Sequence, residues 1–149
     1  MHSFQSNELL TGIAILSVLR NTKKLEITKC LLIEPLLCYK SIKDYLKKSN
    51  CKVRSIEELV VKKSIVFLDF NRRFQERLPL SINSLLLMSE LKLLKIEKNN
   101  VIFTGEKFDF YEKTLGKTAH SIIAAASNLS EILTKEDASS LYLSLRIEL

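Results

Sequence analysis

The pattern of apolar and polar positions changes its period between residues 79 and 105. A helical pattern after Pro79 leads directly into two short alternating runs, 94–97 and 101–104, with an Asn-Asn pair between them. Asparagine tolerates the positive φ that a tight turn requires, so these runs predict a β-hairpin. A helix that leads into a hairpin is how a winged helix ends, and we therefore predict a winged-helix-like core over about 55–105.

A further helix is predicted before this helix and hairpin. Ser55 and Glu58 form a capping box, in which the hydroxyl accepts from the backbone and the carboxylate reaches back. We expect this helix to reach about Arg77, Pro79 to end it, and Ser81 to cap the next one. Apolar residues at helical spacing mark the expected core face of the first helix (Ile56, Val60, Phe67, Phe70, Phe74, Leu78) and of the second (Ile82, Leu85, Leu86, Leu93).

The first third of the chain predicts buried helices. Ser6 or Asn7 can cap a first helix, and residues 9–19 are apolar almost all round, which is typical of a helix that is covered on every side. Gly12 would let another helix approach this one closely. A second apolar segment, 25–38, contains a proline, so we expect a kink or two short helices there.

The last third, about 107–149, is predicted to be helical. Its apolar residues recur at alternating spacings of four and three and form a long seam: Leu115, Ala119, Ile122, Ala126, Leu129 and Leu133. This seam can pack on its own domain or on a partner. The final residues alternate with period two, as strands do, but Asp137 begins a cap, and we favour a short helix that ends near Leu145.

These elements predict one domain, 1–149, that is mostly α with a small β-hairpin and a long C-terminal amphipathic helix. A chain of 149 residues, of which 46% are apolar, is long enough to bury a core. The longest uncharged run, Thr118 to Ser130, is shorter than a membrane span, and Met1-His2-Ser3 lacks the basic start of a signal peptide. We expect a cytoplasmic protein.

The net charge of +6 arises from 23 Lys and Arg against 17 Asp and Glu. Because carboxylates are interleaved with the cations, a solubilising surface explains this charge as well as nucleic-acid binding does. The most basic stretch, 39–54, and a second cluster offer candidate contacts to DNA or phosphate: Lys40, Lys43, Lys47, Lys48, Lys52, Arg54, Arg72, Arg73 and Arg77. The last three can instead complement the dipole at a helix C-terminus.

No catalytic, phosphate-binding or metal-binding motif is visible, so we expect no enzyme activity and no cofactor. The glycines stand alone and form no phosphate loop. Cys30, Cys38 and Cys51 lie too far apart for a CxxC pair, and the two histidines, His2 and His120, are distant from them in sequence. Free thiols in a reducing compartment are the favoured interpretation.

The order of features resembles a known family. An opening apolar helix is followed by the stretch Leu31 to Leu46, with its Pro-Leu-Leu and short basic-acidic segment, and by a phenylalanine-bearing helix that ends in Arg72-Arg73-Phe74. The helix and hairpin from 81 to 103 and a helix around Leu115-Gly116-Lys117 complete the series. This order is similar to the middle component of bacterial three-component systems built around an SMC-like ABC ATPase, the group that includes Lamassu-type anti-phage defence.

The resemblance implies a non-catalytic adaptor that binds the ATPase and couples it to an effector, commonly a nuclease, in antiviral or anti-plasmid defence. DNA would be sensed by the assembly, and the basic stretches could face it. The apolar faces would then meet partner subunits through Leu9, Ile13, Leu16, Leu115, Ala119, Ile122, Ala126 and Leu129.

Two other functions remain open from the sequence. A stand-alone winged-helix regulator would bind duplex DNA as a homodimer through the Leu115–Leu133 seam. Its recognition helix, however, offers base edges little beyond Asn83, Glu90 and Lys92. A small enzyme such as a nuclease has no supporting motif.

Overall fold

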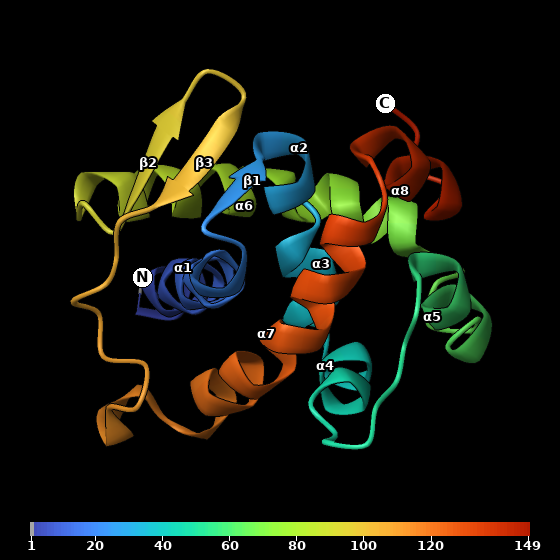
Figure 1. The fold of residues 1–149 in the computed structure, drawn as a ribbon, viewed down its shortest axis with the longest axis horizontal. Helices are drawn as coiled ribbons and strands as arrows, with labels where there is room; N and C mark the ends of the chain where they lie inside the picture. The colour runs from blue at the N-terminus through green and yellow to red at the C-terminus, as the bar shows by residue number, and fades with distance from the viewer. Residues whose placement is uncertain (1) are drawn as a thin grey trace.

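Helix α1 (His2–Thr22) runs through the middle of the domain (Figure 1). The computed structural model describes residues 2–149, with side chains from residue 7 onward. Helices α3 (Ile33–Leu37), α6 (Phe70–Glu90) and α7 (Lys117–Lys135) pack against α1. Ile15, Leu16, Val18 and Leu19 are therefore fully buried, as the all-round apolar pattern predicts. The helix begins at His2, so the prediction of a cap at Ser6 or Asn7 was wrong.

The close helix approach predicted at Gly12 is present. A Cβ atom built at Gly12 would lie 3.0 Å from both Cγ and Sδ of Met88 on α6, and it would clash with the terminal methyl group. A side chain at this position would force the Met88 side chain to move, so glycine favours the close approach of α1 and α6.

A three-stranded antiparallel sheet covers one end of the helices (Figure 1). The predicted hairpin is confirmed as β2 (Leu94–Glu97) and β3 (Asn100–Phe103), although Lys98, with φ 58°, takes the positive φ in the turn. β1 (Lys24–Glu26) adds to the other side of β3 and gives the order β1-β3-β2. The sequence did not predict β1, because three residues are too few to show a period of two.

Helix α6 runs unbroken through Pro79, so the prediction that this proline ends a helix was wrong. Proline has no N–H, so the carbonyl group of Gln75, one turn earlier, lacks its helical hydrogen bond. Pro79 and Gln75 are both exposed, so water can bond to that carbonyl group instead. The continuous helix also changes which residues face inward. Leu85 and Met88 are buried in line with Phe70, whereas Ile82 and Leu86 were predicted as core residues and are exposed.

Short helices fill the stretch between β1 and α6. Two of them, α2 (Ile27–Cys30) and α3, confirm the prediction for 25–38, although the break falls at 31–32 and Pro35 sits in the first turn of α3, where proline is tolerated. α4 (Lys40–Leu46) and α5 (Ile56–Lys62) follow. Ser55 caps α5 by accepting from the Glu58 N–H at 3.1 Å, as predicted, and Glu58 reaches back to the Arg54 N–H. The helix ends at Lys62 instead of continuing to Arg77, and 63–69 form turns.

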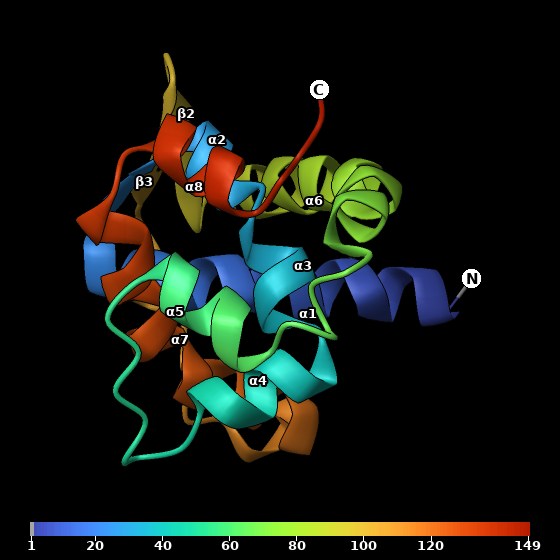
Figure 2. The same ribbon diagram turned by 90° about the vertical axis from the view of Figure 1, so that its right-hand side faces the viewer.

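The C-terminal third is helical, as predicted. A short 3-10 helix, η1 (Lys113–Leu115), precedes α7, which crosses α1 and α4. The final helix, α8 (Ala138–Ser144), is capped by Asp137, whose carboxylate accepts from the Ser140 N–H at 2.8 Å. Figure 2 shows α5, α4 and α8 on one side of the molecule, with α6 running along its top.

The fold class is confirmed as mostly helical with a small antiparallel sheet in one small domain. Phe70 and Phe74 are buried, which confirms them as core residues, and Phe67 packs against Phe70 with ring centroids 5.3 Å apart. The winged-helix assignment stays a prediction.

Candidate functional surfaces

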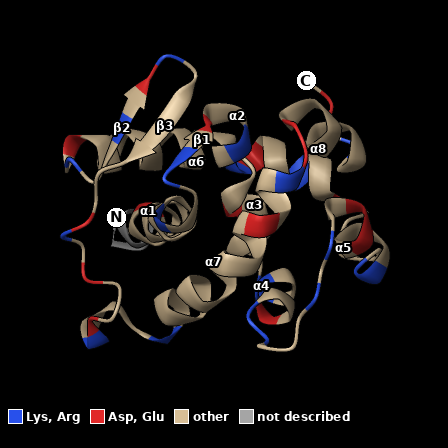
Figure 3. Cartoon of the chain, viewed as in Figure 1, with Lys and Arg blue, Asp and Glu red and all other residues tan. Residues whose placement is uncertain are grey.

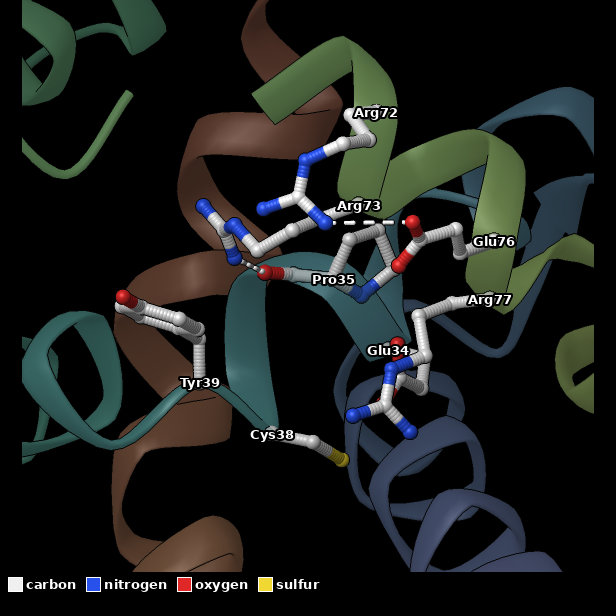
Figure 4. A pocket seen from close by; sticks show the side chains of 8 residues that line it. All are labelled: Glu34, Pro35, Cys38, Tyr39, Arg72, Arg73, Glu76 and Arg77. Carbon is white, nitrogen blue, oxygen red and sulfur yellow. Dashed lines mark hydrogen bonds and ion pairs between the residues drawn. The ribbon is translucent and has the colours of Figure 1, made fainter. Parts of the chain in front are cut away.

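The three predicted arginines all project from the first two turns of α6 toward α3 (Figure 4). They line a cavity of about 240 Å³ together with residues from α3 and the segment after it: Glu34, Pro35, Cys38, Tyr39, Arg72, Arg73, Glu76 and Arg77. Because α6 continues to Glu90, these cations lie at its N-terminus, where the helix dipole disfavours them. The alternative explanation that they complement a C-terminal dipole was therefore wrong.

Arg73 is tied into the fold. Its guanidinium donates to the carbonyl oxygens of Pro35 at 3.1 Å and Val66 at 3.2 Å. It also lies 3.8 Å from the centroid of the Tyr39 ring, a cation–π distance. Only 11% of its side chain is exposed, and burial lowers the pKa of Arg73 from its ordinary value. Arg73 therefore links α6 to α3 and to the 63–69 turns. Few of its N–H groups remain free to bind a ligand.

The other two arginines are paired with carboxylates. Arg72 binds Asp69 and Glu76, and the hydrogen bond from Arg72 lowers the pKa of Asp69. Arg77 approaches the buried Glu34 at 4.0 Å. Burial raises the pKa of the Glu34 carboxyl group, which Arg77 and then Arg73 partly oppose. The charges in this cavity largely cancel, so it is a weak candidate for holding a phosphate group.

The chain's net charge is concentrated in residues 40–63. This segment holds eight Lys and Arg against three Asp and Glu, a net charge of +5 out of +6 for the whole chain. Figure 3 shows Lys and Arg along α4, the loop that follows it, and α5. We call the outward-facing cations of this segment the α4–α5 basic surface: Lys40, Lys47, Lys48, Lys52, Arg54, Lys62 and Lys63.

Tyr45 lies at the middle of the α4–α5 basic surface. The ammonium groups of Lys63, Lys48 and Lys62 lie 5.1, 6.0 and 6.0 Å from the centroid of its ring. The sequence predicted part of this surface but missed Lys62 and Lys63, which the fold brings back to α4. It also included Lys43, which is buried.

An exposed apolar stripe runs along α5 and the turns after it. Val61, Ile65 and Leu68 are spaced four and three residues apart and are 75%, 82% and 83% exposed. Leu68 also lines a cavity of about 290 Å³ between the start of α6 and the end of α8, with Val60, Ser64, Phe67, Asn71, Ser144, Leu145 and Arg146. We call Val61, Ile65 and Leu68 the Val61–Leu68 stripe. We call the cavity the Arg146 groove. Sequence reasoning missed both, because it followed only the buried face of a single predicted helix.

Arg146 is the one charged side chain that lines the Arg146 groove. Among the described residues it takes part in no ion pair with Asp or Glu. The groove therefore combines apolar side chains, the polar side chains of Ser64, Asn71 and Ser144, and one available cation.

Most of the residues predicted to meet a partner lie inside the domain. Ile13, Leu16, Ala119, Ile122, Ala126 and Leu129 are buried, Leu115 is half-buried, and Leu9 is 48% exposed. The long seam thus packs on its own domain, where α1 covers α7. A homodimer through this seam would have to replace contacts that the domain already makes.

The thiols and the histidine show no sign of reactivity within the described part of the chain. The three cysteines are free, and burial raises the pKa values of Cys30 and Cys38 to about 12. The His120 ring is hydrogen-bonded to the Glu112 carbonyl oxygen at 2.8 Å. In residues 2–149, no three His, Cys, Asp or Glu side chains are placed to hold a metal ion, and no helix is long and apolar enough to cross a membrane.

A comparison with protein families identifies this chain's relatives. The model of MC3, described as ABC-three component (ABC-3C) system Middle Component 3, matches residues 12–149. The match covers nearly the whole chain, including the α4–α5 basic surface, the Val61–Leu68 stripe and the Arg146 groove. No curated protein and no solved structure matches the chain.

Proposed function

This chain belongs to the ABC-three component (ABC-3C) system Middle Component 3 family, and we propose that it is a non-catalytic adaptor subunit of such a system. It bridges an SMC-like ABC ATPase and a nuclease-type effector in cytoplasmic defence against viruses or plasmids, as in Lamassu-type systems. A middle component of a three-component system has protein partners, and an adaptor must offer them surface.

The Val61–Leu68 stripe is the observation that carries this proposal. Three large aliphatic side chains, each at least 75% exposed, follow one another between residues 61 and 68, on the end of α5 and the turns after it. Fully burying such a side chain stabilises a complex by roughly 1.5–3 kcal/mol. Their exposure to water does not stabilise the isolated chain. Exposed apolar surface of this kind is typical of protein interfaces.

The occupant of this surface is an apolar helix of a partner subunit that carries an Asp or Glu. The stripe and the apolar side chains of the Arg146 groove fit apolar side chains on the partner, and Arg146 fits a carboxylate. Arg146 is exposed in the isolated chain, so a bound partner would have to cover an ion pair formed there, and removal of that pair would then increase the dissociation rate.

Co-purification tests the proposal. The tagged chain is expressed with the products of its neighbouring genes, and wild type is expected to retain a large ATPase and a second subunit. Ile65→Asp and Leu68→Asp together are expected to release at least one partner. Leu91→Asp, at an exposed leucine beyond the far end of α6, is the control for the single variants Ile65→Asp and Leu68→Asp, which are tested as well, and it should retain both partners.

The outcomes separate clearly. If the wild-type chain retained no neighbouring gene product, the adaptor function would be abandoned. If Leu91→Asp released the partner and the stripe variant did not, the adaptor function would stand and its surface would have to be sought elsewhere. All variants are first checked for native helical content and thermal unfolding.

A further inference from the structure

We propose that the α4–α5 basic surface binds the phosphodiester backbone of nucleic acid directly. This deepens the adaptor function: the subunit itself contributes to holding nucleic acid in the assembly. The argument starts from the distribution of charge. Outside residues 40–63 the cations and carboxylates nearly balance, with 15 Lys and Arg against 14 Asp and Glu. A solubilising surface would have no need to gather its excess charge on one side.

The cations of this surface exceed the carboxylates that can neutralise them. Asp44 pairs with both Lys40 and Lys47, at 2.6 and 3.4 Å, and Glu58 pairs with Lys62 at 3.3 Å. The third carboxylate of the segment, Glu57, faces the Ser144 hydroxyl instead. Four cations therefore have no ion pair among the described residues: Lys48, Lys52, Arg54 and Lys63.

The helix dipoles explain only part of this arrangement. Lys47 and Lys63 are the C-cap residues of α4 and α5, where positive charge is favourable. That effect falls off within the last turn and does not account for Lys52 and Arg54 in the loop. Nor does it account for the three ammonium groups around the Tyr45 ring, of which only that of Lys62 has a carboxylate partner, Glu58, among the described residues.

The surface is also held in place. The Asn128 side chain on α7 donates to the Leu46 carbonyl oxygen at 2.6 Å, at the end of α4. Lys135, also on α7, donates to the Arg54 carbonyl oxygen at 3.1 Å, at the end of the loop. Both ends of the basic loop are thus anchored to the same long helix, so its backbone needs little ordering to bind a polyanion.

The chemistry fits a backbone-binding surface without sequence readout. The cations are exposed, apart from the half-buried Lys63, and they are spread over α4, α5 and the loop between them. Within residues 40–63, Asn50 is the one Asn or Gln side chain that could read a base edge. Tyr45, with its hydroxyl group among the lysines, adds one further donor to phosphate.

Fluorescence anisotropy of the full-length chain with labelled duplex DNA of arbitrary sequence tests this inference. Binding is expected at low salt, with affinity falling as salt rises by a log–log slope of about −0.9 for each phosphate neutralised. Lys48→Glu with Lys63→Glu is expected to weaken binding at least about tenfold and to reduce the slope by about 2. The control, Lys107→Glu with Lys113→Glu, makes the same change of net charge at two exposed lysines outside the surface and should bind nearly as wild type.

Parallel arms use single-stranded DNA, double-stranded RNA and anionic phospholipid vesicles. Binding to any of the nucleic acids with the variant pattern above supports the inference and identifies the form preferred. Absence of binding at low salt, equal loss in the control, or binding to vesicles alone overturns it. Partner retention is measured separately on the same Lys48→Glu, Lys63→Glu variant. That variant should keep its partners, whereas a wild-type chain that keeps its partners but binds no nucleic acid refutes this inference and leaves the adaptor function intact.

Discussion

Arg73 donates a hydrogen bond to the Pro35 carbonyl oxygen, 3.1 Å away, and so joins two helices whose residues lie 38 positions apart (Figure 4). The same guanidinium binds the Val66 carbonyl oxygen and lies over the Tyr39 ring. A cation in this position holds together α3, the 63–69 turns and α6, which are the elements that position the Val61–Leu68 stripe.

Replacing Arg73 is expected to be strongly destabilising. Arg73→Ala removes two charge-assisted hydrogen bonds and a cation–π contact and leaves two carbonyl oxygens without their donor. We expect the free energy of unfolding to fall by about 2–4 kcal/mol, measured by urea denaturation. Arg72→Ala is the matched control, because Arg72 makes only exposed ion pairs. The stability of this variant should stay close to that of wild type. Equal losses in the two variants would contradict the role given to Arg73.

Gly12 and Met88 are expected to be coupled. In wild type, Gly12→Ala places a methyl group against the Met88 side chain, so the free energy of unfolding should fall by about 1–3 kcal/mol. In a Met88→Ala background the clash is gone, and alanine is about 1 kcal/mol better than glycine inside a helix. The sign of the Gly12→Ala effect should therefore reverse.

A double-mutant cycle measured by urea denaturation checks this coupling. If Gly12→Ala had the same effect in both backgrounds, the close approach of α1 and α6 at this point would be wrong.

Local hydrogen bonds explain what the sequence could predict. The caps at Ser55 and Asp137 each join residues three apart, so their signals lie within one helical turn. The hairpin depends on neighbouring runs, and the buried α1 on a continuous apolar stretch. Strand β1 is different, because its partner is β3, more than 70 residues away, and nothing in Lys24–Glu26 alone indicates a strand.

The surfaces were predicted in the same uneven way. Lys48, Lys52 and Arg54 are close in sequence, so local charge marked them. Lys62 and Lys63 join them only because α5 returns to α4 beside Tyr45, a long-range arrangement. The prediction of the partner faces failed for a different reason. An apolar seam has the same sequence pattern whether its own domain or another protein covers it, and here its own domain covers most of it.

Pro79 offers a direct test of the continuous α6. In an unbroken helix, Pro79→Ala restores an N–H donor and removes the clash of the ring with the preceding turn, and proline costs about 3 kcal/mol in a helix interior. We expect the variant to gain about 1–3 kcal/mol in the free energy of unfolding, because Pro79 is exposed and the new methyl group meets no packed side chain. The measurement is urea denaturation with circular dichroism. If the helix ended at this proline instead, alanine would lower stability by freeing the unfolded chain, and a loss would contradict the structure.

Glu34 should make stability depend on pH in the opposite direction to an ordinary paired carboxylate. Burial raises its pKa in the folded state above the unfolded value of about 4.3, so the folded protein binds this proton more tightly. Its contribution to the free energy of unfolding therefore grows as pH falls through the folded pKa and is lost as pH rises through it.

Glu34→Gln removes the titrating group while it keeps the shape. The variant should lose the pH dependence in the range just above the ordinary glutamate pKa and should be at least as stable as wild type at pH 7, because no buried charge remains. The variant also loses the 4.0 Å ion pair between Glu34 and Arg77. This loss should lower the free energy of unfolding only slightly, because 51% of the Arg77 side chain is exposed to water. Urea denaturation of both proteins between pH 4 and pH 8 measures the difference. If wild type lost stability on acidification over this range and the variant did not, Glu34 would be a stabilising anion paired with Arg77, and its assignment as a buried, protonation-favouring group would be incorrect.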